Sequence, residues 1–467
     1  MPKSLVAGLR RDLGTWESYA ALIGILIGAG IFKVTSDAWA LTGPSVILAY
    51  VVLAPAILAT SVAYSVFLST PLGRVPGGEY THLSRTFGGH GLAFVGAWLK
   101  VISYVGALAY LARAFADYLI ELSRGVLPAS ASMAVAMASL VFFYAIHVAG
   151  VRWFGRLQVW MCALLLASLV VLIAPGLFAI RLENYRPFFT HGIGGFAASL
   201  PLLFFAYAGF EALAQTAGEV RDSTQRLPRI FLRGIAITTA IYFLMSAVAF
   251  GVLPGPRLGA SAAPMAEVAS QYLPVGAAWF VTLGAVMALS TSVNATMLVP
   301  SRIAVMLAED GLAPGALGAI SPRTGTPVVA LTVTLIGALL LLLSGQVSLA
   351  LNIAVFALVV LYVLHSVALI MLPITNRELY DSVTLPMSRG MQLLAALLSI
   401  VSMGTLIVLQ LANDFGVLSR RSFPERIRGG SLTTIELMLF WAAIGAVLYA
   451  LAVRRKRNAQ RSDSVTA

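Results

Sequence analysis

The sequence predicts an all-α integral membrane protein with about twelve transmembrane helices. Of its 467 residues, 59% are hydrophobic and only 11% are charged, whereas soluble domains carry about 25% charged residues. The apolar residues also occur in long blocks, and about 20 such residues are enough for a helix to cross the hydrocarbon core of a bilayer. A soluble protein of this length could not cover so much apolar surface, so lipid is the expected solvent.

The apolar segments use up most of the chain and leave no stretch for a separate soluble domain. We expect helices at residues 17–40, 43–69, 90–122, 130–147, 157–178, 194–217, 229–253, 275–302, 326–344, 347–373, 389–411 and 433–453. Turn sequences separate several of them, for example Gly43-Pro44 and Pro254-Gly255-Pro256. Residues 1–16 are expected to form a cytoplasmic N-terminal segment, and residues 454–467 a basic, disordered cytoplasmic tail.

The charge distribution predicts the orientation and excludes one class of partner. The net charge of +12 fits cytoplasmic loops that hold Lys and Arg against anionic lipid, and it gives no reason to expect nucleic acid. With both termini in the cytoplasm, most basic loop residues lie inside, although the arginine cluster at 420–428 opposes this bias. We therefore expect a multi-pass protein of the plasma membrane with both termini cytoplasmic.

The first predicted helix contains Gly28-Ala29-Gly30 at the middle of the membrane. Glycine interrupts a helix at little steric cost because it has no β-carbon, and broken backbone at this depth persists only where it lines a cavity or is buried in protein. A half-helix beginning near Ile31 would direct free N–H groups and a positive dipole end at that cavity, which suits a carboxylate. Close helix packing is the alternative, because Gly24 and Gly28 form a GxxxG step.

The sixth predicted helix, at 194–217, carries a second candidate break. Pro201, the small-residue step Ala208-Gly209 and the carboxylate of Glu211 all fall within one apolar segment. If residues 17–178 and 194–373 are two five-helix repeats, helices one and six occupy corresponding positions. Paired interrupted helices at corresponding positions are typical of a transport site.

Two ionisable residues fall within predicted membrane helices, and one of them, Glu211, is a candidate for a functional role. Glu211 could carry a coupling proton or link substrate binding to gating, because acids within a membrane are usually functional. The alternative is structural, since a carboxylate just after a helix break is stabilised by the dipole of the next helix. Lys100 has no local partner, so it either snorkels to the interface or meets an acid on another helix.

Two pairs of opposite charges lie four residues apart. Lys33 and Asp37 fit a structural ion pair, while the alternative is that Lys33 biases a vestibule against cations and acts in gating. Arg113 and Asp117 repeat the spacing in the third helix and are interpreted as structural.

The eighth predicted helix contains a cluster of polar residues, Ser290, Thr291, Ser292, Asn294 and Thr296. Hydroxyl oxygens suit a hard cation, so Ser290, Ser292 and Thr296 are coupling candidates, and sodium could bind at Ser292 and Thr296. Hydrogen bonding between helices is the alternative. The sequence predicts no other metal site and no cofactor. It contains no phosphate loop and no nucleophile elbow, so no enzymatic activity is expected.

Five motifs occur in a familiar order along the chain. They are Ile27-Gly28-Ala29-Gly30-Ile31-Phe32, Val75-Pro76-Gly77-Gly78-Glu79-Tyr80, the segment 204–211 with Gly218-Glu219 and Leu227-Pro228-Arg229, Ser301-Arg302 with 308–314, and Gly325-Thr326-Pro327. Together they resemble the amino acid–polyamine–organocation (APC) superfamily of permeases, which share the inverted-repeat fold of a bacterial leucine transporter. The resemblance covers nearly the whole chain and implies a 5+5 inverted repeat with broken helices one and six, followed by two helices at 389–453.

The resemblance also implies where a substrate would bind at the first break. Gly28, Ala29 and Gly30 would hold the carboxylate of an amino acid through their backbone N–H groups. Leu26 and Ile31 would lie on either side of them.

At the second break, the resemblance implies contacts to the rest of the substrate. Backbone carbonyls around Phe205 and Ala206 would accept hydrogen bonds from the α-amino group. Phe205, Ala206 and Ala208 would shape the side-chain pocket next to Gly209, and Phe205 or Tyr207 would close over the cargo.

The chain also departs from parts of the family pattern. Proton-coupled relatives often carry a lysine in the fifth helix, but residues 158–168 contain none, so that form of coupling is not expected and the driving ion, H⁺ or Na⁺, stays open. Light-chain relatives pair with a glycoprotein through a loop cysteine. The single cysteine here, Cys162, lies within the membrane, which predicts no disulfide-linked heavy chain.

The expected cargo is a neutral amino acid, apolar or small, carried by alternating access. Apart from Glu211, no acid falls at the middle of helices three, six, eight or ten, and burying an unpaired cation is costly. An acidic amino acid, drawn by Lys33 or Lys100, and a polyamine are alternatives within the same fold. A non-transporting sensor or a channel is the alternative class, but a channel would need a continuous polar stripe or charged rings.

Overall fold

The computed structural model describes residues 9–32, 34–261, 263–420, 422–428 and 432–466. Its first half contains α1 (Thr15–Leu26), α2 (Ala29–Phe32), α3 (Val34–Asp37), α4 (Trp39–Thr42), α5 (Val46–Leu68), α6 (Gly78–Phe87), α7 (Gly91–Leu122), α8 (Ser132–Ala149), α9 (Val151–Gly176), α10 (Gly192–Phe204) and α11 (Ala212–Gln215). The second half contains α12 (Ser223–Val252), α13 (Gly255–Ala260), α14 (Pro264–Ser270), α15 (Val275–Glu309), α16 (Gly315–Gly318), α17 (Val328–Leu343), α18 (Val347–Thr375), α19 (Arg377–Asp381), α20 (Arg389–Leu418), α21 (Phe423–Arg428) and α22 (Thr434–Thr466).

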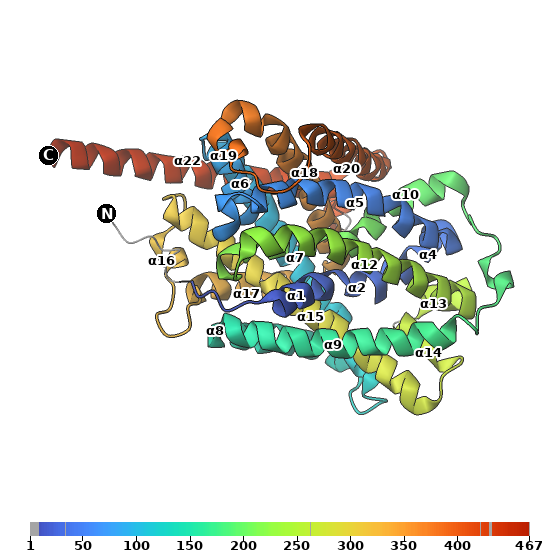
Figure 1. The fold of residues 1–467 in the computed structure, drawn as a ribbon. Helices are drawn as coiled ribbons and strands as arrows, with labels where there is room; N and C mark the ends of the chain where they lie inside the picture. Colours follow the sequence, from blue (N-terminus) through green and yellow to red (C-terminus); the bar gives the residue numbers. More distant parts are fainter. Residues whose placement is uncertain (1–8, 33, 262, 421, 429–431, 467) are drawn as a thin grey trace.

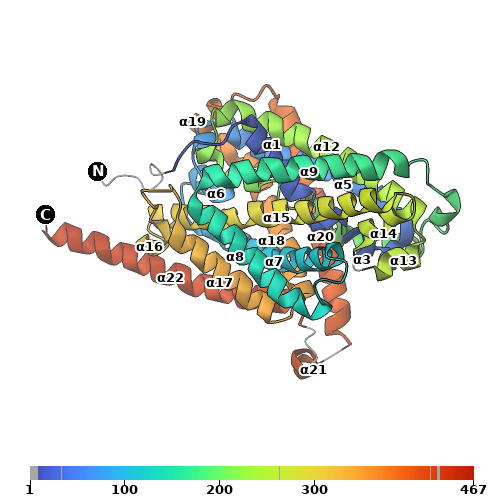
Figure 2. The ribbon, with the colours of Figure 1, turned by 90° about the horizontal axis from the view of Figure 1, so that it is seen from below.

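Within the described residues, eleven helical segments are long and apolar enough to cross a membrane. The apolar helix α17 is shorter and coincides with the expected segment at 326–344. The predicted all-α membrane fold is therefore confirmed, and every expected segment corresponds to a helix. The helices lie lengthwise in one bundle, and the start of α1 and the end of α22 lie at the same end of it (Figures 1 and 2).

The C-terminal segment differs from the expectation. Residues 454–466 continue α22 as a helix that projects beyond the bundle in Figure 1. The prediction of a disordered tail was wrong because the segment is rich in arginine and lysine, which are good helix formers and extend the last apolar helix.

The centre of the bundle is built around α1 and its neighbours. α1 packs against α9, α12 and α15, while α7 packs against α15 and α18. A β-carbon on Gly24 would lie 2.6 Å from Gln158 Nε2 and 2.7 Å from Thr291 Cβ, and one on Gly28 would lie 2.0 Å from Ser292 Oγ. The close-packing interpretation of these two glycines is therefore correct, and it coexists with the break described next.

Candidate functional site

The first break falls between α1 and α2. Ile27 leaves the helical conformation with φ −80° and ψ 75°, and Gly28 N–H donates to Leu26 O over 2.9 Å. The second half-helix begins at Ala29, two residues before the expected start near Ile31. Ile31 N–H and Phe32 N–H both donate to Gly28 O, over 3.3 and 3.2 Å, so at most the first N–H groups of the half-helix, those of Ala29 and Gly30, remain for a ligand.

The second break follows α10. The 3₁₀ turn η6 (Phe205–Tyr207) leads to an extended Ala208, with φ −69° and ψ 143°. Gly209 then adopts φ +105°, a conformation that residues with a β-carbon rarely adopt. Helical structure resumes only in the short α11, so the predicted interruption at Ala208-Gly209 is confirmed.

The two breaks face each other in direct contact. A β-carbon on Gly30 would lie 2.2 Å from Ala206 Cα, so the backbones of α2 and η6 touch. The Tyr242 hydroxyl, on α12, reaches a carbonyl oxygen at each break: it hydrogen bonds to Leu26 O and lies 2.5 Å from Ala206 O. Tyr50 on α5 adds a 3.0 Å hydrogen bond to Gly30 O.

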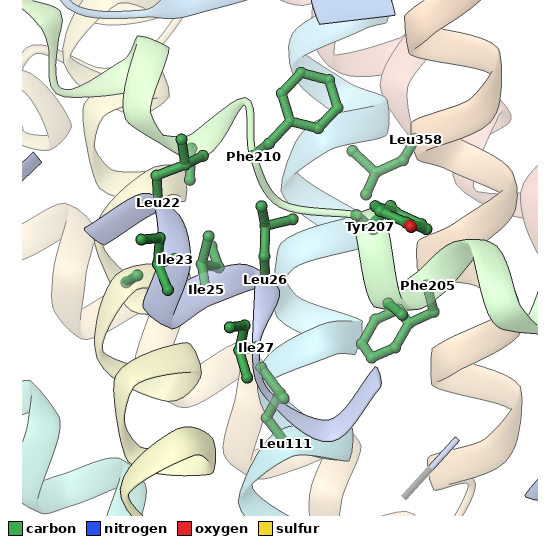
Figure 3. Close-up of a cluster of buried hydrophobic side chains, with 14 of the residues drawn as sticks. Leu22, Ile23, Ile25, Leu26, Ile27, Leu111, Phe205, Tyr207, Phe210 and Leu358 are labelled. Carbon is green, nitrogen blue, oxygen red and sulfur yellow. The ribbon is translucent and has the colours of Figure 1, made fainter. Parts of the chain in front are cut away.

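A small cavity lies between the breaks. Its volume is about 30 Å³, which is room for one or two water molecules, so the cavity must widen to admit an amino acid. The lining residues are Ile25, Leu26, Gly30, Ser103, Tyr104, Ala107, Leu111, Phe205, Ala208, Gly209, Thr296 and Leu358. Figure 3 shows the side chains of Leu26, Leu111, Phe205 and Leu358 around the two broken segments. Among the described residues, no charged side chain lines this cavity.

The cavity includes five residues that the sequence placed at a substrate site, namely Leu26, Gly30, Phe205, Ala208 and Gly209. The first two come from the first break and the other three from the second. Both broken segments therefore line one cavity, and substrate binding there stays a prediction.

Other predicted site residues lie beside the cavity rather than in its wall. Ala206 and Ile31 are buried, and Ala29 is described by its backbone alone. Tyr207 donates to Tyr50 O over 2.9 Å and to Thr239 Oγ1 over 3.2 Å. Of the two aromatic side chains expected to close over a cargo, only that of Phe205 borders the cavity.

Sequence reasoning missed the part of the wall that belongs to α7 and α18. These residues are Ser103, Tyr104, Ala107, Leu111 and Leu358. They lie in unbroken apolar helices, so only an alignment of helix faces could have indicated them. Tyr242 was missed for the same reason.

The hydroxyl groups of α15 divide into three groups. Ser292 and Thr291 donate to Gly24 O at 2.9 and 2.8 Å, which is the interhelical bonding considered as an alternative to sodium. Ser290 donates within its own helix, to Val286 O. Thr296 borders the cavity. Sodium ligation at Ser292 and Thr296 stays a prediction.

Glu211 is fully buried next to the second break. Tyr104 OH donates to its Oε1 over 2.8 Å, Gly209 N–H donates to Oε2 over 3.1 Å, and Tyr362 OH also donates to Oε2. Because Tyr104 also borders the cavity, one hydroxyl connects the cavity wall to this carboxylate. Lys100 Nζ lies 3.7 Å from Glu211 Oε1, so Lys100 meets acids on other elements and does not snorkel.

Of the two ion pairs predicted four residues apart, the structure describes one, Arg113 with Asp117. Arg113 Nε lies 3.6 Å from Asp117 Oδ1, which confirms that ion pair. Lys33 lies outside the described residues. Its expected partner Asp37 accepts a 3.3 Å hydrogen bond from Tyr110 OH.

We expect Tyr242→Phe to slow amino acid exchange in liposomes by about tenfold. The Tyr242 hydroxyl contacts a carbonyl oxygen at each break, Leu26 O and Ala206 O. Leaving a buried polar group without its hydrogen-bond partner costs about 1–3 kcal/mol. Tyr144→Phe is the matched control, because that hydroxyl bonds Thr332 Oγ1 over 2.8 Å between α8 and α17, outside the cavity wall. Exchange at the wild-type rate in Tyr242→Phe would show that the bridge between the breaks is dispensable.

Comparison with known proteins extends the assignment from the fold to the family. The model of a family described as amino acid permease matches residues 13–453. The branched-chain amino acid permease BcaP of Bacillus subtilis is 26% identical over 69% of this chain and 72% of its own. The methylthioribose transporter of the same species is 27% identical, covering 68% and 72%. Cationic amino acid transporter 9 of Arabidopsis thaliana is 27% identical, covering 67% and 58%. The chain therefore belongs to the amino acid permease family of the APC superfamily.

Proposed function

We propose that this protein is a secondary active transporter of neutral, apolar amino acids that works by alternating access. The observation that carries the proposal is the contact of two broken helices around a cavity whose described lining is uncharged and mostly apolar, with Ser103, Tyr104 and Thr296 as its polar side chains. Broken helices supply backbone groups that bind the charged ends of an amino acid without a charged side chain. The lining then selects the substrate side chain.

The backbone at the two breaks provides both ends of this binding site. The start of α2 offers the N–H groups of Ala29 and Gly30 and a positive dipole end to the carboxylate. Leu26 O already accepts from Gly28 N–H and Tyr242 OH, whereas Ala206 O, which accepts from Tyr242, has a second lone pair for the α-amino group. The substrate side chain would then lie against Ala107 and Leu358.

The cavity lining favours an apolar amino acid over a cationic or an acidic one. A cationic side chain would be buried without an acid beside it, which is costly. The acidic alternative loses its attraction to Lys100, because that ammonium lies 2.6 Å from Glu79 Oε1 and is outside the cavity wall. An apolar side chain, such as a branched aliphatic one, gains from burial against Leu111 and its neighbours. We place the protein in the plasma membrane with both termini cytoplasmic, and without a disulfide-linked subunit.

Counterflow in proteoliposomes tests this function. Vesicles preloaded with unlabelled leucine, valine, alanine, lysine, glutamate or putrescine are given a trace of the same labelled compound. We expect accelerated uptake with leucine and valine, and rates for lysine, glutamate and putrescine near those of empty vesicles. Absence of counterflow with every compound would reject the transporter and favour a sensor, whereas flux that preloading does not accelerate would indicate a channel.

A further inference from the structure

A second and much larger cavity lies at the side of the bundle, apart from the proposed substrate site. It is an apolar groove between α17 and α22, and residues of α7, of α15 and of the loop after α15 line it as well. α17 and α22 follow the same edge of the bundle in Figure 2. The groove has a volume of about 870 Å³, which lies in the range of small-molecule sites, about 300–1,000 Å³. It is therefore large enough for a ligand, and the proposed transport does not use it.

The polar side chains of the groove, apart from Arg455, are already bonded within the protein. The indole N–H of Trp98 donates to Trp441 O over 2.8 Å, and that of Trp441 donates to Trp98 O over 2.9 Å. Thr334 and Ser344 donate to carbonyl oxygens of α17. Because these groups need no further partner, this part of the groove suits a hydrocarbon ligand.

One end of the groove carries a cation. Among the described residues that line it, Arg455 alone is charged, and its exposed side chain lies at the end of the apolar part of α22. The next residue, Lys456, donates to Asp310 O over 3.1 Å, which holds this end of α22 against the bundle. The Asp310 carboxylate is itself engaged by Tyr80 and Arg85. The end of the groove therefore presents an accessible guanidinium group to a ligand.

The length of the groove matches one leaflet of a bilayer. Trp98 and Trp441 stack with their ring centroids 4.1 Å apart and their planes 7° apart, and they form part of the wall far from Arg455. Trp441 precedes Arg455 by 14 residues on the same helix, so about 21 Å of helix axis separates them. Half a bilayer with its headgroup layer is about 20–22 Å thick. A lipid headgroup at Arg455 would therefore place the ends of its acyl chains near the two tryptophans.

We infer that this groove binds one phospholipid with an anionic headgroup, with its phosphate group at Arg455 and its acyl chains between α17 and α22. Basic pockets between helices on the cytoplasmic side of a membrane protein bind anionic lipid headgroups, and the cytoplasmic leaflet is the anionic one. The guanidinium group of an arginine can form two parallel hydrogen bonds to a phosphate group. The inference goes beyond the proposed function and does not depend on which substrate is carried.

The groove and the substrate cavity share two helices. On α15, Pro300 borders the groove, and Thr296, about one turn earlier, borders the cavity. On α7, Ile102 borders the groove and the next residue, Ser103, borders the cavity. A lipid in the groove would therefore pack against the same two helices that form part of the cavity wall, and would help to hold them in place.

Quenching of tryptophan fluorescence by brominated lipid tests the inference, because the acyl chains would end near Trp98 and Trp441. Wild-type protein in phosphatidylcholine nanodiscs is given increasing fractions of phosphatidylglycerol with dibrominated acyl chains. We expect a saturable loss of fluorescence at fractions too low to replace most of the surrounding lipid. Dibrominated phosphatidylcholine at the same fractions should give only the proportional loss that surrounding lipid causes.

Two pairs of variants connect the signal to the groove. Arg455→Gln should raise the fraction of phosphatidylglycerol needed for half-saturation by about tenfold or more, which is typical for the loss of a hydrogen bond to a charged group. Arg454→Gln is the matched control, because it removes the same charge from an exposed neighbour outside the lining, and its effect should be clearly smaller. Ala452→Phe adds a ring inside the groove and should abolish saturation. Ala450→Phe adds the same ring at an exposed position outside the lining and should preserve it.

The opposite results would overturn the inference. Equal quenching by the two brominated lipids would show that the groove does not select an anionic headgroup, and equal effects of the two arginine variants would remove the phosphate from Arg455. Native mass spectrometry of protein purified in mild detergent is an independent check, in which the wild type should retain phosphatidylglycerol and Arg455→Gln should lose it. A retained polypeptide in place of lipid would show that a partner helix fills the groove, and would also overturn the lipid site.

Discussion

Gly30→Ala is expected to reduce leucine counterflow by about 10²-fold or more, because misplacement of a site by about 1 Å has effects of this size. The added methyl group would stand 2.2 Å from Ala206 Cα and 3.0 Å from Ala206 N. Both contacts are with backbone, which cannot rotate away as a side chain can. The substitution would push α2 away from η6 and separate the two groups of backbone atoms that the proposed site requires.

The measurement is counterflow in proteoliposomes, with the amount of inserted protein determined for each variant. Gly404→Ala is the matched control, since a β-carbon at that position on α20 would meet nothing within 4 Å. We expect the control to transport as the wild type does and both variants to insert normally. Unimpaired counterflow by Gly30→Ala would contradict the assignment of the site to the contact between the breaks.

Arg302→Met is expected to lower the free energy of unfolding by about 3–5 kcal/mol, which is typical when one partner of a buried ion pair is removed. Arg302 and Glu219 are at most 1% exposed, and Nη2 and Nε of Arg302 donate to the two carboxylate oxygens over 2.8 and 3.3 Å. Without the guanidinium group, the Glu219 carboxylate would be buried with no counter-charge. The pair joins α15 to the turn after α11, so its loss should loosen the end of the bundle near the termini.

Thermal and denaturant unfolding in detergent would measure this loss. Arg377→Met is the control, because the Arg377–Asp381 pair is mostly exposed, at 72% and 58%, and exposed pairs contribute about 0–1 kcal/mol. The double variant Arg302→Met/Glu219→Gln should recover part of the stability, since it removes the uncompensated charge. A loss below about 1 kcal/mol in the single variant, the range of an exposed pair, would show that the pair is not required for stability.

The sequence predicted the membrane fold and both helix breaks because each depends on local properties. Hydropathy is a sum over neighbouring residues, so the number and approximate limits of the helices could be counted directly. The break at Gly28 and the reversal at Gly209 were visible because glycine has an unusual local conformational range. The family resemblance then indicated which backbone atoms lie at the proposed site.

The identity of the side chains that meet could not be predicted in the same way. Lys100 had no partner within its own helix, yet it lies between Glu79 and Glu211, which the fold brings from other elements. His82 and His365 are 283 residues apart in sequence and in contact. These contacts depend on how each helix is rotated about its axis, and a uniformly apolar helix gives no sequence signal for that rotation.

By itself, then, the sequence determined that this chain crosses a membrane many times and interrupts its first and sixth helices, because apolar length and glycine act locally. Only the tertiary structure decided which α7 and α18 residues form the cavity wall. It also decided that the Tyr242 hydroxyl contacts a carbonyl oxygen at each break, and that the buried acids Glu79 and Glu211 both lie near Lys100. Those features arise where helix faces meet, and the packing of the whole bundle determines which faces those are.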